Sequence, residues 1–109
     1  MVEKSVLIII KKYLRAVAER GIPVQAGVLF GSYATGKVHE WSDIDLLVIS
    51  PRFDGEYKRR DIDLLWHVAA DIDSRIEPIA VGERQYRESN DSYILFEARR
   101  EGQIIPLAE

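Results

Sequence analysis

Residues 43–50 form the clearest predicted strand and constrain the fold most. Within them, four consecutive apolar residues run from Leu46 to Ile49. Because successive strand side chains point to opposite faces, this run makes both faces of the strand apolar. Such a strand is typical of the centre of a sheet that helices cover. The chain is therefore expected to build its fold around this segment.

The rest of the chain alternates between helix and strand patterns. Residues 2–20 carry apolar side chains at three- and four-residue steps, which predicts a helix that Gly21 ends. Pro78 places a strand over 75–81 at a sheet edge or strand end. The other predicted elements are strands over 24–30 and 103–107, helices over 57–71, 83–88 and 93–100, a loop with one helical turn over 31–41, and a loop over 51–55. An α/β (α+β) fold is expected, a small mixed sheet with helices packed against it.

Composition predicts one compact domain, residues 1–109, because this length is too short for two. The net charge of -3 provides no broad basic field, so direct binding to nucleic acid is not favoured. The absence of cysteine excludes disulfides, thiolate zinc sites and a cysteine nucleophile. The apolar run 6–10 is too short for a membrane span and lacks a cleavage site, so a soluble, cytoplasmic protein is expected.

The tripeptide Asp-Ile-Asp occurs three times, at 43–45, 61–63 and 71–73. In a strand, residues two apart share a face, so Asp43 and Asp45 would direct two carboxylates to one place. Adjacent carboxylates repel each other, and a divalent cation between them relieves that repulsion. The first copy therefore predicts a metal site.

The other two copies fall on or beside a predicted helix, where the same spacing separates side chains by about 200° around the axis. Asp61 and Asp63 are expected on the solvated side, with Asp61 paired to Lys58. Asp73 and Ser74 are expected to serve a turn. The apolar stripe of this helix consists of Ile62, Leu65, Trp66 and Ala69.

Gly31-Ser32 follows the predicted strand 24–30 and opens a tight turn. Glycine lets a backbone approach a ligand closely, and the amides of such a turn can bind an anion. Ser32 can donate to a phosphate oxygen, Gly36 permits a second turn, and Lys37 supplies positive charge. A plain glycine turn with surface aspartates is the alternative for either motif alone, but their combination at this separation is far more specific.

At these residues the sequence resembles the DNA polymerase beta-like nucleotidyltransferase superfamily, above all its smallest branch, the minimal nucleotidyltransferases. The family pattern is Gly-Ser, a glycine a few residues later, then Ser-Asp-x-Asp-Leu entering a hydrophobic strand. It is matched by Gly31, Ser32, Gly36, Ser42, Asp43, Asp45 and Leu46. The order of the flanking elements also fits, so the resemblance spans most of the chain and implies the polymerase beta-like fold.

The resemblance also implies roles for individual residues. Asp43 and Asp45 would hold two Mg²⁺ ions, and Glu77 would match the third carboxylate, as metal ligand and proton acceptor. Many relatives carry Asp at that position, and a competing interpretation makes Glu77 a surface residue paired with Arg75. The nucleotide would be bound by Gly31, Ser32, Lys37 and Ser42.

The implied reaction transfers a nucleoside monophosphate, AMP from ATP in the leading hypothesis, to a hydroxyl. Minimal nucleotidyltransferases are commonly antitoxins of HEPN-domain toxins, and some transfer AMP to a toxin tyrosine. A HEPN-domain partner in a hetero-oligomer is therefore expected, since no segment has the pattern of a dedicated acceptor pocket. Two alternatives stay open: a small-molecule enzyme of the aminoglycoside-modifying kind, and a non-catalytic module that acts by occlusion.

Overall fold

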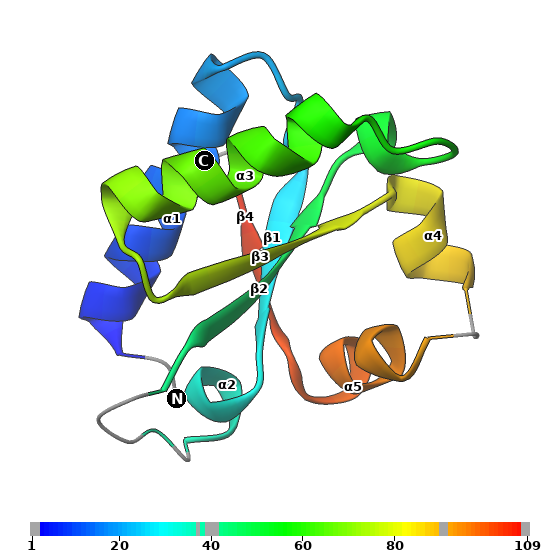
Figure 1. Cartoon of the computed structure of the whole chain (residues 1–109). Helices are drawn as coiled ribbons and strands as arrows, with labels where there is room; N and C mark the ends of the chain where they lie inside the picture. The colour runs from blue at the N-terminus through cyan, green and yellow to red at the C-terminus, as the bar shows by residue number, and fades with distance from the viewer. Residues whose placement is uncertain (1–2, 37, 39–41, 90–91, 108–109) are drawn as a thin grey trace.

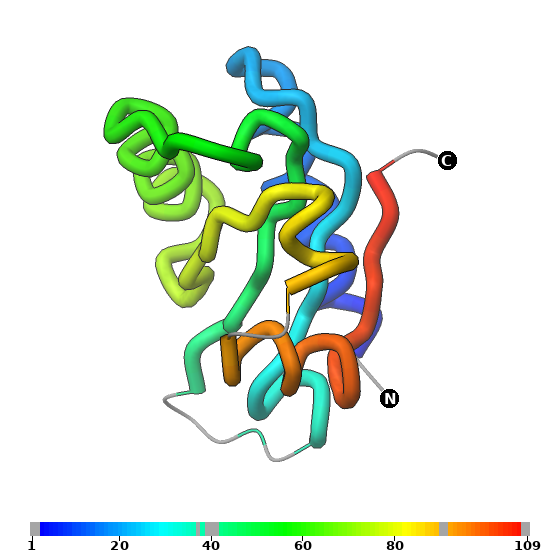
Figure 2. The backbone as a smooth tube through the Cα atoms, turned by 90° about the vertical axis from the view of Figure 1, so that its right-hand side faces the viewer, coloured from blue at the N-terminus to red at the C-terminus, as the bar shows by residue number. Residues whose placement is uncertain are grey.

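The described residues form one mixed sheet of four strands in the order β3-β2-β1-β4. In this computed structural model, the central strand β2 (Ile44–Ile49) is antiparallel to β1 (Ala26–Phe30) and parallel to β3 (Ile76–Val81). The strand β4 (Gln103–Pro106) pairs with the other side of β1. Figure 2 shows β4 at one edge of the sheet. The structure describes residues 3–36, 38, 42–89 and 92–107.

The longer helices are divided between the two sides of the sheet. Figure 1 shows α1 (Lys4–Glu19) and α3 (Arg59–Ile72) on one side, and α4 (Glu83–Glu88) and α5 (Tyr93–Glu101) on the other. The short helix α2 (Ser32–Thr35) follows β1, and a 3-10 turn, η1 (Pro51–Phe53), follows β2. This order confirms the predicted elements, and β3 is an edge strand as Pro78 indicated. None of the described helices is long and apolar enough to cross a bilayer.

Alternation along β2 distributes its side chains between two cores. Leu46 and Val48 pack in the larger core with the buried side chains of α1 and α3. Leu47 and Ile49 pack in the smaller core with those of α5. All four are buried, which confirms the predicted central strand. Because Asp45 alternates in step with Leu47, it points to the α5 side of the sheet.

The helices α1 and α3 are joined by a buried polar contact as well as by apolar packing. The Tyr13 hydroxyl donates to the Leu65 carbonyl at 2.9 Å. Burial raises the pKa of the Tyr13 phenol well above its usual range, so this donor keeps its proton. Gly21, with a φ of 106°, follows α1 as a residue able to adopt a left-handed backbone, in agreement with its predicted role.

Two expectations for α3 are wrong. Asp61 is only 4% exposed, and its carboxylate accepts from Arg52 of η1, with 3.0 Å between Arg52 Nε and Asp61 Oδ2. The carboxylate therefore does not face solvent beside Lys58, because η1 brings a guanidinium against this side of the helix. Trp66 is 48% exposed. The buried apolar side chains of the helix are instead Leu65, Val68 and Ala69.

Candidate active site

Three half-buried side chains form a row across the sheet on its α5 side. Phe30 of β1 lies opposite Asp45 of β2, and Asp45 lies beside Glu77 of β3. Side chains of residues paired across neighbouring strands project from the same face, so this register brings Asp45 and Glu77 together. Asp43 is exposed and stands just before β2 begins. The structure thus gathers the three carboxylates that the sequence nominated.

Two of the three carboxyl groups, Asp45 and Glu77, have raised pKa values. Partial burial and then the charge of Asp43 raise the pKa of Asp45. The pKa of Glu77 is also raised, first by a hydrogen bond shared with Asp43, then by desolvation and by the charges of Asp43 and Asp45. Each effect disfavours the state in which Asp45 and Glu77 are both ionised. A bound divalent cation would relieve the same repulsion without a proton.

The donor atoms suit a hard metal ion, because Mg²⁺ prefers carboxylate oxygens. Among the described residues, however, no three His, Cys, Asp or Glu side chains already surround one metal position. The pKa shifts report proximity, whereas a coordination site also needs the oxygens to converge. Asp43, Asp45 and Glu77 would therefore have to rotate toward a bound ion, and their metal-binding roles stay predictions.

Gly31 places the predicted phosphate turn directly against Asp45. Its backbone, with φ 74° and ψ -150°, lies in a region that is essentially restricted to glycine. A Cβ at this position would also overlap the Asp45 carboxylate oxygen. The Gly31 carbonyl accepts from the amides of Ala34 and Thr35, each at 3.1 Å, as α2 begins. The requirement for glycine therefore arises from both backbone conformation and the adjoining carboxylate.

The other residues predicted to bind the nucleotide are Ser32, Ser42 and Lys37. Ser32 is half-buried at the start of α2, next to Gly31. Ser42 is buried just before Asp43 and already takes part in an interaction. Lys37 lies outside the described residues. Binding of nucleotide by any of the four stays a prediction.

Arg75 does not pair with Glu77, so the competing surface-pair interpretation of Glu77 is wrong. The Arg75 guanidinium pairs with Asp73, at 2.7 Å between Nη2 and Oδ2. It also donates through Nη1 to the Tyr33 hydroxyl at 2.9 Å. Asp73 accepts from the Arg75 amide as well, which confirms that it serves the turn before β3. Sequence reasoning missed the contact with Tyr33, because nothing local indicates it.

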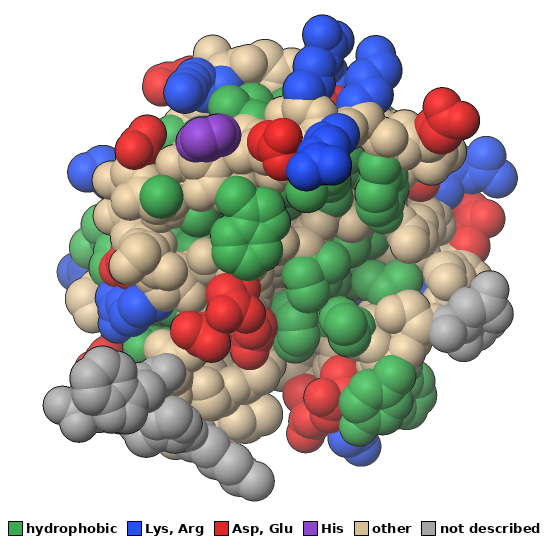
Figure 3. All heavy atoms as spheres, viewed as in Figure 1, with side chains coloured by type: hydrophobic (Ala, Val, Ile, Leu, Met, Phe, Trp, Pro, Cys, Tyr) green, Lys and Arg blue, Asp and Glu red, His purple; other side chains and the backbone are tan. Residues whose placement is uncertain are grey.

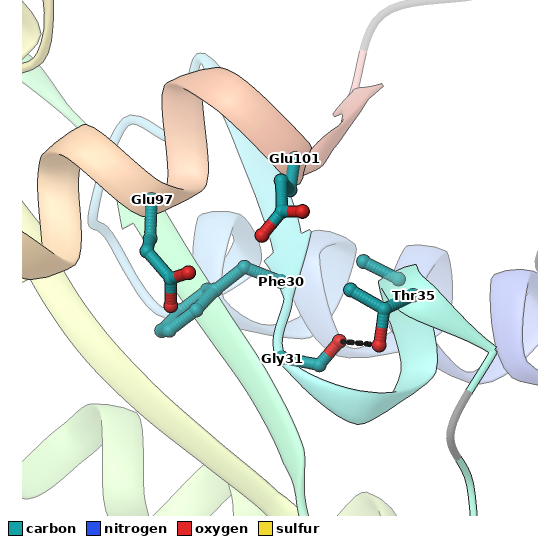
Figure 4. A pocket seen from close by; sticks show the side chains of 6 residues that line it. Phe30, Gly31, Thr35, Glu97 and Glu101 are labelled. Atoms are coloured by element: carbon teal, nitrogen blue, oxygen red, sulfur yellow. Dashed lines mark hydrogen bonds between the residues drawn. The ribbon is translucent and has the colours of Figure 1, made fainter.

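A pocket of about 660 Å³ adjoins this site. Helices α2 and α5 lie side by side at one end of the sheet, and Figure 4 shows the Glu97 and Glu101 side chains of α5 directed toward the pocket. Because Phe30 belongs both to this lining and to the row with Asp45, the pocket lies beside the carboxylates. Its lining consists of Phe30, Gly31, Ala34, Thr35, Glu97 and Glu101. The sequence shows no such pocket because distant segments form it.

The arrangement of glycine turn and strand carboxylates belongs to a recognised class of domain. Residues 10–101 match the nucleotidyltransferase domain family, so the chain belongs to that family. A protein from Sulfolobus solfataricus, described as a nucleotidyltransferase, has a similar structure with a TM-score of 0.63. The two are 19% identical over 90% of this chain and 77% of that chain. The predicted fold class is thereby confirmed.

Two other similar structures contain toxin–antitoxin proteins. One, a toxin–antitoxin with AMP-PNP, is 24% identical, with a TM-score of 0.57 over 86% of this chain and 70% of that chain. The other is an MntA-HpeT toxin–antitoxin mutant with two aspartate-to-glutamate substitutions. It is 22% identical, with the same TM-score and coverage. At these identities the likeness shows the fold alone. No curated protein matches the chain significantly.

Proposed function

We propose that this chain transfers a nucleoside monophosphate, AMP from ATP in the first instance, to a hydroxyl group in a Mg²⁺-dependent reaction. The contact between Gly31 and Asp45 carries the proposal. It sets a turn suited to phosphate against one of three mutually repelling carboxylates. A phosphate and a divalent cation that bind together would satisfy both halves of such a site.

The reaction can be written with the residues of this chain in defined roles. The acceptor oxygen forms a bond to the α-phosphorus of ATP, while the bond from that phosphorus to the bridging oxygen of the β-phosphate breaks. Pyrophosphate leaves, and the hydroxyl proton moves to Glu77. Bound Mg²⁺ would supply electrostatic stabilisation of the attacking and leaving oxygens.

The residues fall into a metal-binding set and a phosphate-binding set in this scheme. Asp43, Asp45 and Glu77 would hold the metal ions. The phosphates are bound by Gly31, Ser32, Ser42 and Lys37, and the positive charge of Lys37 offsets the negative charge of the pyrophosphate. Glu77 would in addition accept the proton of the acceptor hydroxyl.

The acceptor we favour is a tyrosine of a HEPN-domain toxin, with this chain as the antitoxin. Support comes from the two similar toxin–antitoxin structures, one of them with AMP-PNP. The chain also exposes three large apolar side chains on α5, Tyr93, Ile94 and Phe96, next to the glutamates of the pocket. Figure 3 shows hydrophobic and acidic side chains together on the face toward the viewer. A protein partner would cover such a surface.

A small, positively charged acceptor is the second candidate. The pocket beside Gly31 has a volume of about 660 Å³ and carries the carboxylates of Glu97 and Glu101. A volume of this order accommodates a small molecule, and amino groups of an aminoglycoside-like acceptor would pair with the two carboxylates. This candidate needs no partner protein to provide the hydroxyl.

The decisive experiment incubates the purified chain with α-labelled ATP, Mg²⁺ and either a HEPN-domain toxin or an aminoglycoside. Label is expected on the toxin. The Asp45→Ala variant is expected to transfer none, while the control Asp63→Ala, which alters the exposed copy of the tripeptide on α3, is expected to match the wild type. No transfer to either acceptor, or equal transfer by Asp45→Ala, would overturn the proposal. Inhibition of the toxin without label would indicate occlusion instead.

A further inference from the structure

A chain of contacts connects α2 with the turn that leads into β3, the strand that carries Glu77. The Arg75 guanidinium donates to both oxygens of Asp73, through Nε at 3.0 Å and Nη2 at 2.7 Å. Its remaining terminal nitrogen donates to the Tyr33 hydroxyl. The same guanidinium lies over the Tyr33 ring, 5.9 Å from its centroid. Arg75 therefore contacts Tyr33 at the hydroxyl, with its charge near the ring.

The position of Arg75 joins three segments of the site. Its carbonyl accepts from the Ile44 amide at 2.8 Å, where β2 begins. Ile44 is flanked by Asp43 and Asp45, and Glu77 follows Arg75 by two residues. Tyr33, in turn, is the second residue of α2, two residues after Gly31. One residue thus touches the strand of the aspartates, the strand of Glu77 and the helix of the glycine turn.

Burial and charge indicate that Arg75 holds these segments and does not bind substrate. Tyr33 is only 8% exposed, so its ring is a fixed partner. The Arg75 side chain is 43% exposed, yet its guanidinium is already paired with Asp73 and Tyr33. The planar fork of arginine can make both contacts at once, which a lysine ammonium on its flexible stem cannot reproduce.

We propose that Arg75 is a positioning residue, which through Tyr33 fixes the Gly31-Ser32 turn relative to Glu77. This inference rests on the proposed nucleotidyl transfer, because it assigns the turn to the phosphates and Glu77 to the acceptor proton. Loss of the link would let α2 shift without removing any group that binds nucleotide. A misplacement of about 1 Å in such a site costs on the order of 100-fold in rate.

Two variants test the link, and a third serves as a matched control. Tyr33→Phe removes only the hydroxyl, and Arg75→Lys removes the fork but keeps the charge. The control is Tyr57→Phe, because the Tyr57 hydroxyl donates at 2.9 Å to the Ala80 carbonyl near the far end of the same strand β3. All three replacements delete a polar contact made by β3 or by the residue that precedes it, but only the first two lie at the site.

Initial rates with ATP and Mg²⁺ give the first measurement. We expect kcat to fall about 10-fold in Tyr33→Phe and further in Arg75→Lys, with KM for ATP within about threefold of the wild type. Tyr57→Phe, which removes a hydroxyl that contacts Ala80 and Gln85 away from the site, is expected to keep both constants. Equal kcat in Tyr33→Phe and Tyr57→Phe would overturn the proposal and leave Arg75 with a purely structural role.

Hydrogen exchange separates this inference from the proposed reaction. The amides of Ala34 and Thr35, both bonded to the Gly31 carbonyl, are expected to exchange about 10-fold faster in Tyr33→Phe and Arg75→Lys, and unchanged in Tyr57→Phe. Unchanged exchange in the first two variants would overturn the link even if transfer occurs. If the wild type transfers nothing but the exchange increases as expected, the link stands and the proposed reaction fails.

Discussion

Two copies of Asp-Ile-Asp, at 43–45 and 61–63, differ in the charged groups that surround their carboxylates. At the first copy, burial and then the charge of Asp43 raise the pKa of Asp45, and the pKa of the neighbouring Glu77 is raised first by its hydrogen bond with Asp43. At the second copy, Asp61 is buried against the Arg52 guanidinium. Asp63, on the exposed side of the same helix, pairs loosely with Arg59 at 3.9 Å.

The backbone produces this difference. Strand pairing sets Asp45 beside Glu77, and Asp43, just before β2, lies close enough to raise the pKa of both. A helix separates the same two positions, so Asp61 and Asp63 meet different surroundings. The helical copy receives its cations from the chain itself, whereas the strand copy groups negative charge that a metal ion would neutralise. The comparison therefore distinguishes a carboxylate paired within the fold from carboxylates that the proposed function assigns to a metal ion.

Asp→Asn substitution in each copy should give the largest contrast. We expect Asp61→Asn to lower the free energy of unfolding by about 3 kcal/mol, because it leaves the Arg52 charge without its buried partner. That loss corresponds to a melting temperature lower by roughly 15 °C for a domain of this size. Asp45→Asn removes one member of a repelling group, so its free energy of unfolding should equal or exceed that of the wild type.

Urea denaturation of both variants measures this contrast. The m value should stay that of the wild type, since neither change alters the surface exposed on unfolding. A large loss of stability in Asp45→Asn, with little in Asp61→Asn, would reverse the assignment of structural and ligand-binding roles.

Two glycines extend the comparison to the turn that faces Asp45. Gly31→Ala should lower the free energy of unfolding by about 2–3 kcal/mol, because its backbone region is essentially restricted to glycine. Its Cβ would also displace the Asp45 carboxylate, so nucleotide binding should weaken. Gly36→Ala should cost only about 1 kcal/mol, since its left-handed backbone has open space around it. Calorimetry with ATP and Mg²⁺ measures the binding, and equal affinities in the two variants would contradict the contact's importance.

Local periodicity was sufficient to predict most of the fold and the position of Asp45 on the central strand. The apolar run in residues 43–50 depends only on neighbours along the chain, so this strand follows from the sequence. Contacts between residues far apart in the sequence do not follow from local periodicity. Arg52 of η1 pairs with Asp61 of α3. Arg75 contacts Tyr33, which lies 42 residues earlier in the sequence, so both contacts depend on tertiary structure. The pocket beside Gly31 was missed for the same reason.

Lower pH should increase the contribution of the strand carboxyl groups Asp45 and Glu77 to stability and decrease that of the turn carboxylate Asp73. A raised pKa means that the folded state binds a proton more tightly than the unfolded state. The contribution of Asp45 and Glu77 to stability is therefore largest below their ordinary pKa values of 3.8 and 4.5, and is lost as the pH rises through their raised values. Arg75 lowers the pKa of Asp73, whose contribution is instead present above its ordinary value and lost as the pH falls.

Melting temperatures measured across this range, with and without Mg²⁺, test that opposition. Mild acidification from neutral pH should raise the melting temperature of the metal-free wild type before stronger acid lowers it. Mg²⁺ should remove the rise, because the cation then compensates the negative charge, and Glu77→Gln should reduce it without any metal. If the rise in melting temperature is unchanged in Glu77→Gln, groups other than Glu77 cause it.

Asp63→Asn should have the smallest effect. Asp63 is well exposed, and its pair with Arg59 spans one helical turn at 3.9 Å, so solvent and salt screen it. Such exposed pairs contribute at most about 0.5 kcal/mol. We expect a melting temperature within a few degrees of the wild type at low salt and no difference at high salt, where the pair is screened. Asp61, two residues earlier on the same helix, gives the matched contrast. Large losses in both variants would mean that the helix, rather than the contact with Arg52, determines how costly the substitution is.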